Sequence, residues 1–399
     1  MAVRAHERGE LTDPLLVVAP ASVVGTWAEE AARFCPDLRV VVIAATQRRR
    51  GSDLAQAVAG AHVVVTSYTL LRLEDEAYRA IRWSGLLLDE AQFVKNHRSR
   101  TYQAARRLGA PFTLAITGTP LENSLMDLWS MFSLVAPGLF PRPDLFADRY
   151  RKPIEGGTDP EQLDVLRRRV RPFMLRRTKE AVAPELPAKQ EQTLHIALTP
   201  AHRRIYGQHL QRERQRVLGL LGDMDRNRIA IFRALTLLRQ LSLDPSLVDD
   251  AYAGKGPSAK VESLMEQLEE VAAEGHRALV FSSFTGFLKL VRQRLDAEGI
   301  GYCYLDGSTR DRPRRIAAFR TGDDPVFLIS LKAGGFGLTL TEADYVFILD
   351  PWWNPAAEAQ AVDRTHRIGQ DKPVMVYRMV SQDTIEEKVV ALQGRKRDL

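Results

Sequence analysis

The sequence Leu86-Leu87-Leu88-Asp89-Glu90-Ala91-Gln92 joins a short apolar run to two adjacent carboxylates. An apolar run of this length, ended by polar residues, is typical of a buried strand in a parallel sheet. Ligands of such sheets bind beyond the carboxyl ends of the strands, where Asp89 and Glu90 stand. The stretch therefore predicts both the architecture of the chain around it and the place of a functional site.

Short apolar runs alternate with helical patterns in two parts of the chain, as expected for parallel sheets with crossover helices. In the first part we expect strands at 15–19, 39–43, 62–66, 86–88 and 112–116, and helices at 23–34 and 101–108. In the second we expect strands at 278–281, 302–305, 326–329, 345–349 and 374–379, and helices at 286–297, 312–319 and 356–366. The pattern predicts an α/β protein with two parallel sheets.

Between these parts the pattern changes to long charged helices with breaks marked by proline, among them 200–221 and 229–243. We expect a helical insertion there, with a joint at 254–257 before the second sheet. The predicted domains are a first lobe at 1–136, a helical protrusion and linker at 137–260, and a second lobe at 261–399.

The composition excludes several classes of protein. Of 399 residues, 45% are hydrophobic and 27% are charged, which is ordinary for a globular protein. No apolar run approaches the ~20 residues of a membrane helix, and Cys35 and Cys303 form no CxxC pair. We therefore expect a cytoplasmic protein without a membrane partner, associated with the nucleoid if bacterial and nuclear if eukaryotic.

Arginines are clustered, which is more informative than the net charge of +6. Such clusters suit a path lined by phosphates. The alternative, a set of solvated faces, is equally open for any one cluster. The clusters stand at 48–50, 167–171, 176–177, 203–204, 312–315 and 395–397.

The acidic pair can serve two tasks, because adjacent side chains at a strand end point in different directions. One carboxylate can hold Mg²⁺ through water while the other orients or deprotonates an attacking water. The alternative is a pair of charges that stabilise a helix N-terminus.

Hydroxyl side chains follow two of the expected strands. Thr117-Gly118-Thr119-Pro120 can hydrogen-bond the acidic pair and a nucleic-acid backbone, and Thr66-Ser67-Tyr68 offers further donors for phosphates. Turn chemistry and helix capping are the alternative explanation of both stretches.

The second part supplies cations. Arg364 and Arg367 are three residues apart and would share one face of the helix expected at 356–366. Arginines from a second domain can complete a γ-phosphate site on the first. The alternative is that they satisfy the last carbonyls of that helix.

A glycine-rich stretch at 330–338 brings Lys332 and its backbone within reach of phosphates. Trp352 and Trp353 follow a later strand, where they can stack against a nucleic acid. Burial in the core is the commoner fate of tryptophan.

The order of these stretches resembles the Swi/Snf family of helicase-like DNA translocases within helicase superfamily two. The resemblance covers nearly the whole chain, and Gln92 stands where many relatives have histidine. The matching stretches are 16–27 (motif Ia), 65–68 (Ib), 89–92 (the DEAH/DEAQ box), 117–123 (III), 172–179 (a block particular to this family), 280–284 (IV), 330–338 (V) and 360–370 (VI).

The resemblance implies two RecA-like parallel-sheet lobes, the P-loop NTPase helicase core, with a helical insertion between them and a first lobe truncated at its N-terminus. It implies ATP and Mg²⁺ as cofactors and double-stranded DNA as partner, along which such enzymes track while displacing a bound complex such as RNA polymerase. It assigns catalysis to Asp89, Glu90, Arg364 and Arg367, of which the two carboxylates also hold the metal. Nucleotide binding falls to Gln92, Gly337 and Asp363, coupling to Thr117, Gly118 and Thr119, and nucleic-acid binding to Ser67, Tyr68, Ser283, Thr309, Lys332 and Trp353.

The family's phosphate-binding loop, GxxxxGK[ST], has no match in the sequence. Gly254-Lys255-Gly256 comes nearest, but it follows no expected strand and lacks the serine or threonine. We therefore expect ATP hydrolysis only where a segment upstream of Met1 or a partner chain supplies this loop. The alternatives are a DNA-binding or regulatory module that hydrolyses no ATP, and a strand-separating helicase, which the block at 172–179 disfavours.

Overall fold

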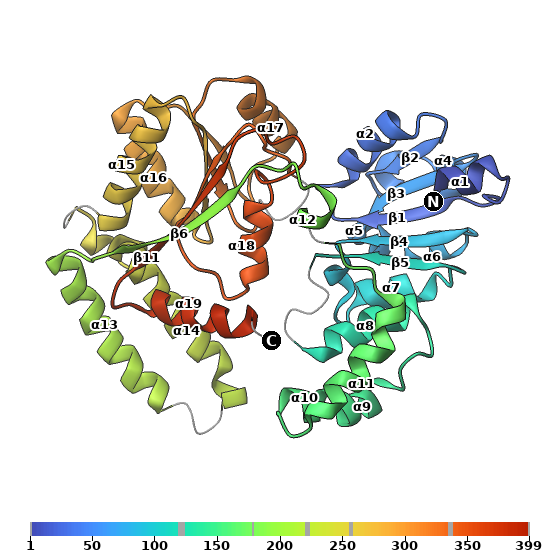
Figure 1. Cartoon of the computed structure of the whole chain (residues 1–399), viewed down its shortest axis with the longest axis horizontal. Helices are drawn as coiled ribbons and strands as arrows, with labels where there is room; N and C mark the ends of the chain where they lie inside the picture. The colour runs from blue at the N-terminus through green and yellow to red at the C-terminus, as the bar shows by residue number, and fades with distance from the viewer. Residues whose placement is uncertain are drawn as a thin grey trace. The chain divides into compact units, whose positions relative to one another are not determined.

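The computed structural model describes residues 2–118, 124–177, 179–219, 224–254, 258–333 and 338–397. The chain forms two compact units, Met1–Arg177 and Thr178–Leu399, each built on its own parallel sheet (Figure 1). Two parallel sheets confirm the expected α/β fold class.

The sheet of the first unit has the order β2-β3-β1-β4-β5. Both faces of the central strand are covered, because residues 16–19 are at most 1% exposed. β1 is therefore almost wholly apolar, as a central parallel strand must be. The strands are β1 (Leu15–Ala19), β2 (Val40–Ile43), β3 (Val63–Ser67), β4 (Gly85–Asp89) and β5 (Thr113–Ile116).

Helices of the first unit form two groups. One group accompanies the sheet: α1 (Ala2–Glu7), α2 (Val24–Phe34), α3 (Gln47–Arg50), α4 (Leu54–Val58), α5 (Tyr68–Leu73), α6 (Asp75–Arg79), η1 (Ala91–Val94) and α7 (Arg100–Arg107). The other packs around a core of its own that includes Phe146, Tyr150 and Leu166: α8 (Leu125–Val135), α9 (Pro143–Phe146), η2 (Ala147–Arg151), α10 (Lys152–Glu155), α11 (Pro160–Val170) and η3 (Arg171–Phe173).

The sheet of the second unit has the order β6-β11-β10-β7-β9-β8. Its inner strands β7 and β9 are fully buried, so apolar residues fill both of their faces. The strands are β6 (Lys189–Ile196), β7 (Ala278–Ser282), β8 (Tyr302–Leu305), β9 (Val326–Ser330), β10 (Tyr345–Ile348) and β11 (Val374–Ser381).

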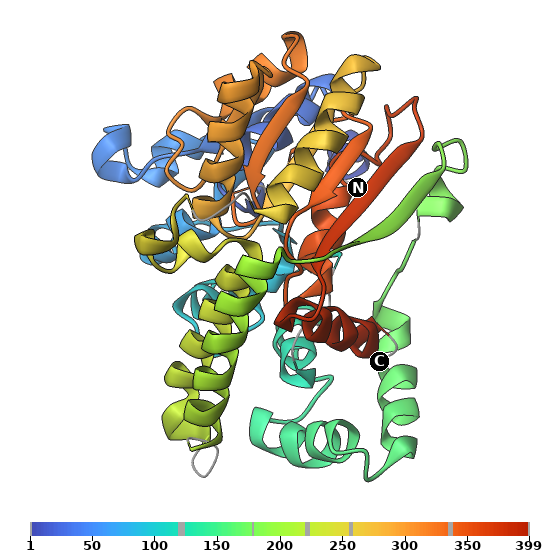
Figure 2. The same cartoon turned by 90° about the vertical axis from the view of Figure 1, so that its left-hand side faces the viewer.

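Two long helices of the second unit, α13 and α14, pack side by side as a hairpin that leaves the sheet (Figure 2). The helices in the described part of this unit are α12 (Lys179–Val182), α13 (Pro200–Leu218), α14 (Met224–Leu243), η5 (Pro245–Leu247), η6 (Asp250–Tyr252), α15 (Ala259–Ala273), α16 (Thr285–Glu298), α17 (Arg312–Thr321), α18 (Pro355–Val362) and α19 (Ile385–Arg397).

All ten expected strands are present, with ends that differ by at most two residues. The stretch 137–260, expected to hold a helical protrusion and linker, also contains the strand β6, which the sequence did not predict. β6 pairs with β11 over its full length as the edge of the sheet, and most of its residues are exposed. An exposed edge strand carries polar residues, and its partner lies far along the chain, so neither local pattern nor composition marks it.

The expected protrusion is divided between the two units. Helices α9 to α11 belong to the first unit, whereas α13 and α14 belong to the second. Among the described residues, no helix combines the length and the apolar composition needed to cross a bilayer.

Candidate active site

Asp89 ends β4, and three donors hold it in place. The indole Nε1 of Trp27 donates to Oδ2 at 2.8 Å, and the backbone N–H of Glu90 donates to Oδ1 at 3.0 Å. The hydroxyl of Tyr68 donates to the backbone carbonyl of Asp89 at 2.7 Å. Both the carboxylate and the end of the strand are therefore oriented before any ligand binds.

Glu90 adopts a left-handed backbone conformation, with φ of 50°. A residue with a side chain pays about 1 to 3 kcal/mol for such a conformation, which persists only where its surroundings impose it. The two adjacent carboxylates have different partners, since Asp89 accepts from Trp27 and Glu90 accepts from Gln92. Backbone strain of this kind is found at functional sites, and here it falls on the predicted catalytic pair.

Gln92 connects the ends of two neighbouring strands. Its Nε2 donates to Glu90 Oε2 at 2.8 Å, and its Oε1 accepts from Thr117 Oγ1 at 2.8 Å. Thr117 follows β5, which pairs with β4, so the sheet itself brings these residues together. Asp89, Glu90, Gln92 and Thr117 thus form one polar group at the carboxyl ends of β4 and β5. Gly118 lies beside this group in the chain and is exposed, whereas Thr119 lies outside the described residues.

Ser67 and Tyr68 are buried. The Ser67 hydroxyl caps α5 by accepting from the backbone N–H of Leu70, and Tyr68 stacks on Phe93. Burial, followed by the nearby charges of Asp89 and Glu90, raises the pKa of Tyr68 well above its usual value, so the phenol remains a donor. Contact of either side chain with a nucleic acid stays a prediction, since both are engaged within the fold.

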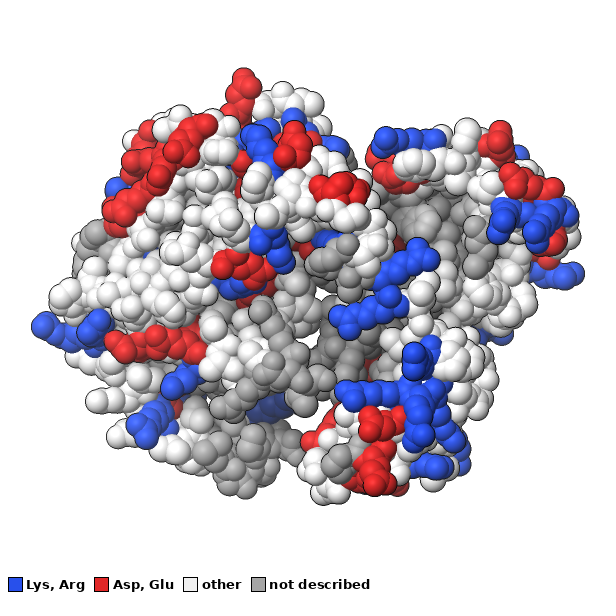
Figure 3. All heavy atoms as spheres, in the orientation of Figure 1, with Lys and Arg blue, Asp and Glu red and all other residues white. Residues whose placement is uncertain are grey.

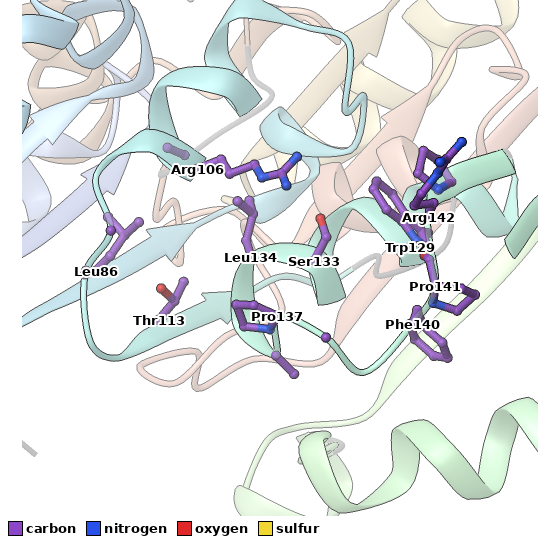
Figure 4. Close-up of a pocket in the computed structure, with 16 residues that line it drawn as sticks. Leu86, Arg106, Thr113, Trp129, Ser133, Leu134, Pro137, Phe140, Pro141 and Arg142 are labelled. Carbon is purple, nitrogen blue, oxygen red and sulfur yellow. Dashed lines mark hydrogen bonds between the residues drawn. The ribbon is translucent and has the colours of Figure 1, made fainter. Parts of the chain in front are cut away.

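A cavity of about 530 Å³ lies in the first unit near Trp129 and Ser133 (Figure 4). Its lining includes Leu86 and Thr113, which stand at the amino ends of β4 and β5. The acidic pair stands at the opposite ends of the same strands. None of the predicted site residues lines this cavity, so the cavity is distinct from the candidate site at the strand ends.

The carboxylates fit a magnesium ion that is shared with a nucleotide. Among the described residues, no cluster of three or more His, Cys, Asp or Glu side chains could hold a metal alone. Mg²⁺ needs no such cluster, because one or two carboxylates together with phosphates and water complete its shell. Asp89 offers hard oxygen donors in a fixed orientation, which suits this mode.

Arg364 and Arg367 do not share a helical face, because α18 ends at Val362. Both stand in the turns that follow. Arg364 is buried and its Nη1 donates to the Leu338 carbonyl at 3.4 Å, whereas exposed Arg367 donates from Nη1 to Thr339 Oγ1 at 3.2 Å. The two arginines are nevertheless brought together, since they bond adjacent residues, Leu338 at the end of the glycine-rich stretch and Thr339 directly after it. Gly337 of that stretch lies outside the described residues.

Asp363 forms an ion pair within its own unit. Its Oδ1 lies 2.6 Å from Lys179 Nζ, which also donates to the His366 carbonyl at 2.7 Å. His366 in turn has its Nε2 2.9 Å from the Pro187 carbonyl. The start of the second unit is therefore fastened to the turn that carries the arginines.

The residues predicted to bind nucleic acid in the second unit stand on separate loops. Ser283 follows β7, Thr309 bonds Asp306 after β8, exposed Lys332 follows β9, and half-buried Trp353 follows β10. All four loops leave the carboxyl ends of strands of one sheet, so the structure brings them to the same edge.

Sequence reasoning missed Arg239, which donates to Asp350 beside Ser283. A charged residue within the apolar stripe of 229–243 was the signal that could have found it. It missed Lys179 as the partner of Asp363 as well, and no local pattern marks that pair.

Arginines gather over α11 and the segment that follows it (Figure 3). Arg167, Arg168, Arg169 and Arg171 are exposed, as are Arg176 and Arg177. These exposed arginines thus form a positive surface over the end of α11 and the segment that follows it.

Comparison with known proteins places these sites in context. The SNF2-related domain matches residues 2–247, and the helicase conserved C-terminal domain matches residues 259–369. The putative ATP-dependent helicase/translocase YwqA of Bacillus subtilis is 35% identical, over 100% of this chain and 44% of that protein. The chromodomain-helicase-DNA-binding protein 1-like of Mus musculus is 35% identical, over 98% and 44%.

The Sulfolobus solfataricus SWI2/SNF2 ATPase core, solved in complex with double-stranded DNA, is 31% identical, with a TM-score of 0.46. The match covers 100% of this chain and 83% of that one. The chain spans less than half the length of the curated relatives named above.

Proposed function

This chain belongs to the SNF2-related family, and from that premise we propose that it is the ATPase core of a motor that moves along double-stranded DNA and displaces bound proteins. The observation that carries the proposal is the polar group at the ends of β4 and β5. It couples an acidic pair to a neighbouring strand end through Gln92, with bonds of 2.8 Å on either side.

In this proposal Asp89 would hold Mg²⁺ through water, and the bound ion would supply positive charge for the phosphates of ATP. Glu90 orients the attacking water and accepts its proton. Gln92 orients the Glu90 carboxylate toward that water through one hydrogen bond, and through its second bond it couples a displacement of Glu90 to Thr117. The bond from Trp27 keeps Asp89 from turning away from the ion.

Arg364 and Arg367 are proposed to stabilise negative charge on the transferred γ-phosphoryl group. Support comes from their common approach to residues 338–339, which places two guanidinium groups on one surface of the second unit. Asp363 acts on this turn through Lys179 and is therefore proposed as a positioning residue rather than a direct ligand of the nucleotide.

Double-stranded DNA is the proposed partner, contacted by Ser283, Thr309, Lys332 and Trp353 at the edge of the second sheet. The exposed arginines of α11 and the segment after it supply sequence-independent attraction to phosphates. A bound complex such as RNA polymerase is the proposed cargo.

ATP hydrolysis in this family uses a loop that binds the β- and γ-phosphates. The 399 residues contain no GxxxxGK[ST], and turnover is therefore proposed to need such a loop in addition to them. The test is ATP hydrolysis by the complete gene product, with and without duplex DNA. We expect duplex DNA to stimulate hydrolysis, and Lys→Ala in such a loop to abolish it. A product that binds ATP but never responds to duplex DNA would contradict the proposal.

A second candidate, a DNA-binding module that hydrolyses no ATP, is consistent with the 399 residues, which contain no GxxxxGK[ST]. It predicts duplex binding that falls with salt and is indifferent to ATP. Duplex titrations of the complete gene product with and without ATP separate the two candidates.

A further inference from the structure

Arg239 is a buried arginine on α14 that no part of the proposed reaction uses. Its side chain is 4% exposed, and that of Asp350, its partner, is 1% exposed. Burying two charges costs several kcal/mol for each ion unless geometry and further hydrogen bonds compensate. A pair kept under these conditions needs a reason beyond stability.

The guanidinium group ties α14 to two loops. Its Nη2 donates to Asp350 Oδ2 at 3.1 Å, to the Pro351 carbonyl at 2.9 Å and to Ser283 Oγ at 3.1 Å. These acceptors belong to the loops 282–284 and 350–353, which leave the paired strands β7 and β10. One side chain therefore sets the distance between two neighbouring strand ends.

Asp350 completes the junction from the other side. Its Oδ1 accepts from Ser282 Oγ at 2.5 Å and from the Ser283 backbone N–H at 3.0 Å, and its Oδ2 accepts from the Ser283 hydroxyl. The first loop is thus held by a carboxylate that the arginine itself orients. Removing the arginine would release both loops together.

Aromatic rings surround the guanidinium group. Its central carbon lies 4.9 Å from the ring centroid of Phe284, 5.1 Å from that of Trp352 and 5.7 Å from that of Trp353. A planar, weakly hydrated guanidinium group suits such surroundings, whereas the compact ammonium of lysine does not. Arginine is therefore required for its shape as well as for its charge.

We propose that Arg239 is the positioning residue that holds the loops 282–284 and 350–353 in the geometry that binds duplex DNA. The inference rests on the proposed function, which assigns Ser283 and Trp353 to that contact. Arg239 itself is buried and does not touch the DNA. Its effect is to fix in advance two loops that would otherwise have to be ordered during binding.

The test titrates a fluorescent duplex with the 399-residue chain over a series of salt concentrations. Arg239→Lys keeps the charge and loses the planar group. We expect it to weaken binding about tenfold, or about 1.4 kcal/mol. The slope of log K against log salt stays unchanged, because no phosphate contact is lost. An arginine that met a phosphate would instead lower the slope by about one.

Lys260→Met is the matched control. Lys260 forms a second buried pair among the described residues of this unit, with Glu386 at 2.6 Å and both side chains 1% exposed. It also donates to the carbonyls of Leu349, next to the second loop, and Met379, but to no residue of the two loops themselves. It is expected to lower the unfolding temperature and to leave duplex affinity unchanged below that temperature.

Equal loss of duplex affinity in Arg239→Lys and Lys260→Met would mean that Arg239 only stabilises the fold, and would overturn the inference. Unchanged duplex binding by Arg239→Lys, or a reduced salt slope in that variant, would overturn it as well. Failure of the unaltered chain to bind duplex DNA would instead overturn the proposed function. Should Arg239→Lys lose its near-ultraviolet dichroism, the double variant R239M/D350N, which removes both buried charges, is titrated with the same expectations.

Discussion

Lys179 Nζ lies 2.6 Å from Asp363 Oδ1, and the same ammonium donates to the His366 carbonyl at 2.7 Å. A residue at the very start of the second unit thereby holds the turn that carries both predicted γ-phosphate arginines. This ion pair and hydrogen bond connect the family-specific stretch at 172–179 to the segment 360–370, although the two are far apart in the sequence.

Lys179→Met is expected to lower DNA-stimulated ATP turnover several-fold with little change in unfolding free energy. Both side chains of the pair are substantially exposed, so the pair itself contributes about 1 kcal/mol or less. Loss of turnover would arise because the arginine turn moves more freely. Steady-state hydrolysis and thermal unfolding of the complete gene product measure the two effects.

Lys152→Met serves as its control, because Lys152 pairs with Asp148 at the same 2.6 Å on an exposed surface of the first unit. Its turnover should match that of the unaltered protein. An equal loss of ATP turnover in both variants would show that the Lys179–Asp363 pair has no specific role in positioning the arginine turn.

Gln92→Ala removes the link between Glu90 and Thr117 and is expected to lower turnover by about 10- to 100-fold, since small displacements of a catalytic group are costly. Thr117→Val breaks only the second bond. The double variant should be no worse than Gln92→Ala, because the two residues act through one chain of bonds. Gln103→Ala is the matched control, because the amide of Gln103 bonds only the His97 carbonyl among the contacts described. Fully additive losses would argue that Gln92 and Thr117 act independently.

Trp27→Phe keeps an aromatic ring and removes the donor to Asp89 Oδ2. A hydrogen bond to a charged group contributes about 2 kcal/mol, so urea unfolding should detect its loss, and turnover should fall as well. Trp83→Phe removes an indole bond of the same length to a neutral acceptor, the Tyr78 carbonyl at 2.8 Å, at the other end of β4 from the acidic pair. It should change stability alone. Turnover that is lowered equally by both substitutions would contradict a role for Trp27 in holding Asp89.

Glu191 makes the stability of the second unit depend on pH in the acidic range. Burial would raise its pKa, but hydrogen bonds from Lys189 and Arg378 outweigh burial and lower it to about 2 from 4.5. A carboxyl with a depressed pKa stabilises the fold above its unfolded value and loses that contribution as pH falls toward the folded value. The unfolding temperature should therefore drop between pH 4.5 and about 2, and Glu191→Gln should flatten that part of the curve. An unchanged profile in this variant would remove Glu191 as the cause.

The strands and the acidic pair could be predicted because they depend on local sequence. β1 and β4 are short apolar runs, and the polar residues that follow a parallel strand must stand at its carboxyl end. β6 could not be predicted, since a polar edge strand is specified by its partner β11 rather than by its own pattern.

In the second unit, single residues also have positions that are set by partners far along the chain and not by local sequence. The arginines were placed on a helix by spacing alone, but α18 ends at Val362, and tertiary bonds to residues 338–339 bring them together instead. Arg239 and Lys179 find their partners across more than a hundred positions, which no local rule encodes.

The central proposal is that Glu90 and Arg367 serve the same ATP hydrolysis, and the rate of duplex-stimulated hydrolysis tests it most directly. Residues that act as a unit have losses that do not add. In the complete gene product, Glu90→Gln and Arg367→Ala should each lower the stimulated rate by about 10³-fold or more, and the double variant should be no slower than the worse of the two. Losses that multiply, or a stimulated rate that either variant leaves intact, would contradict the account.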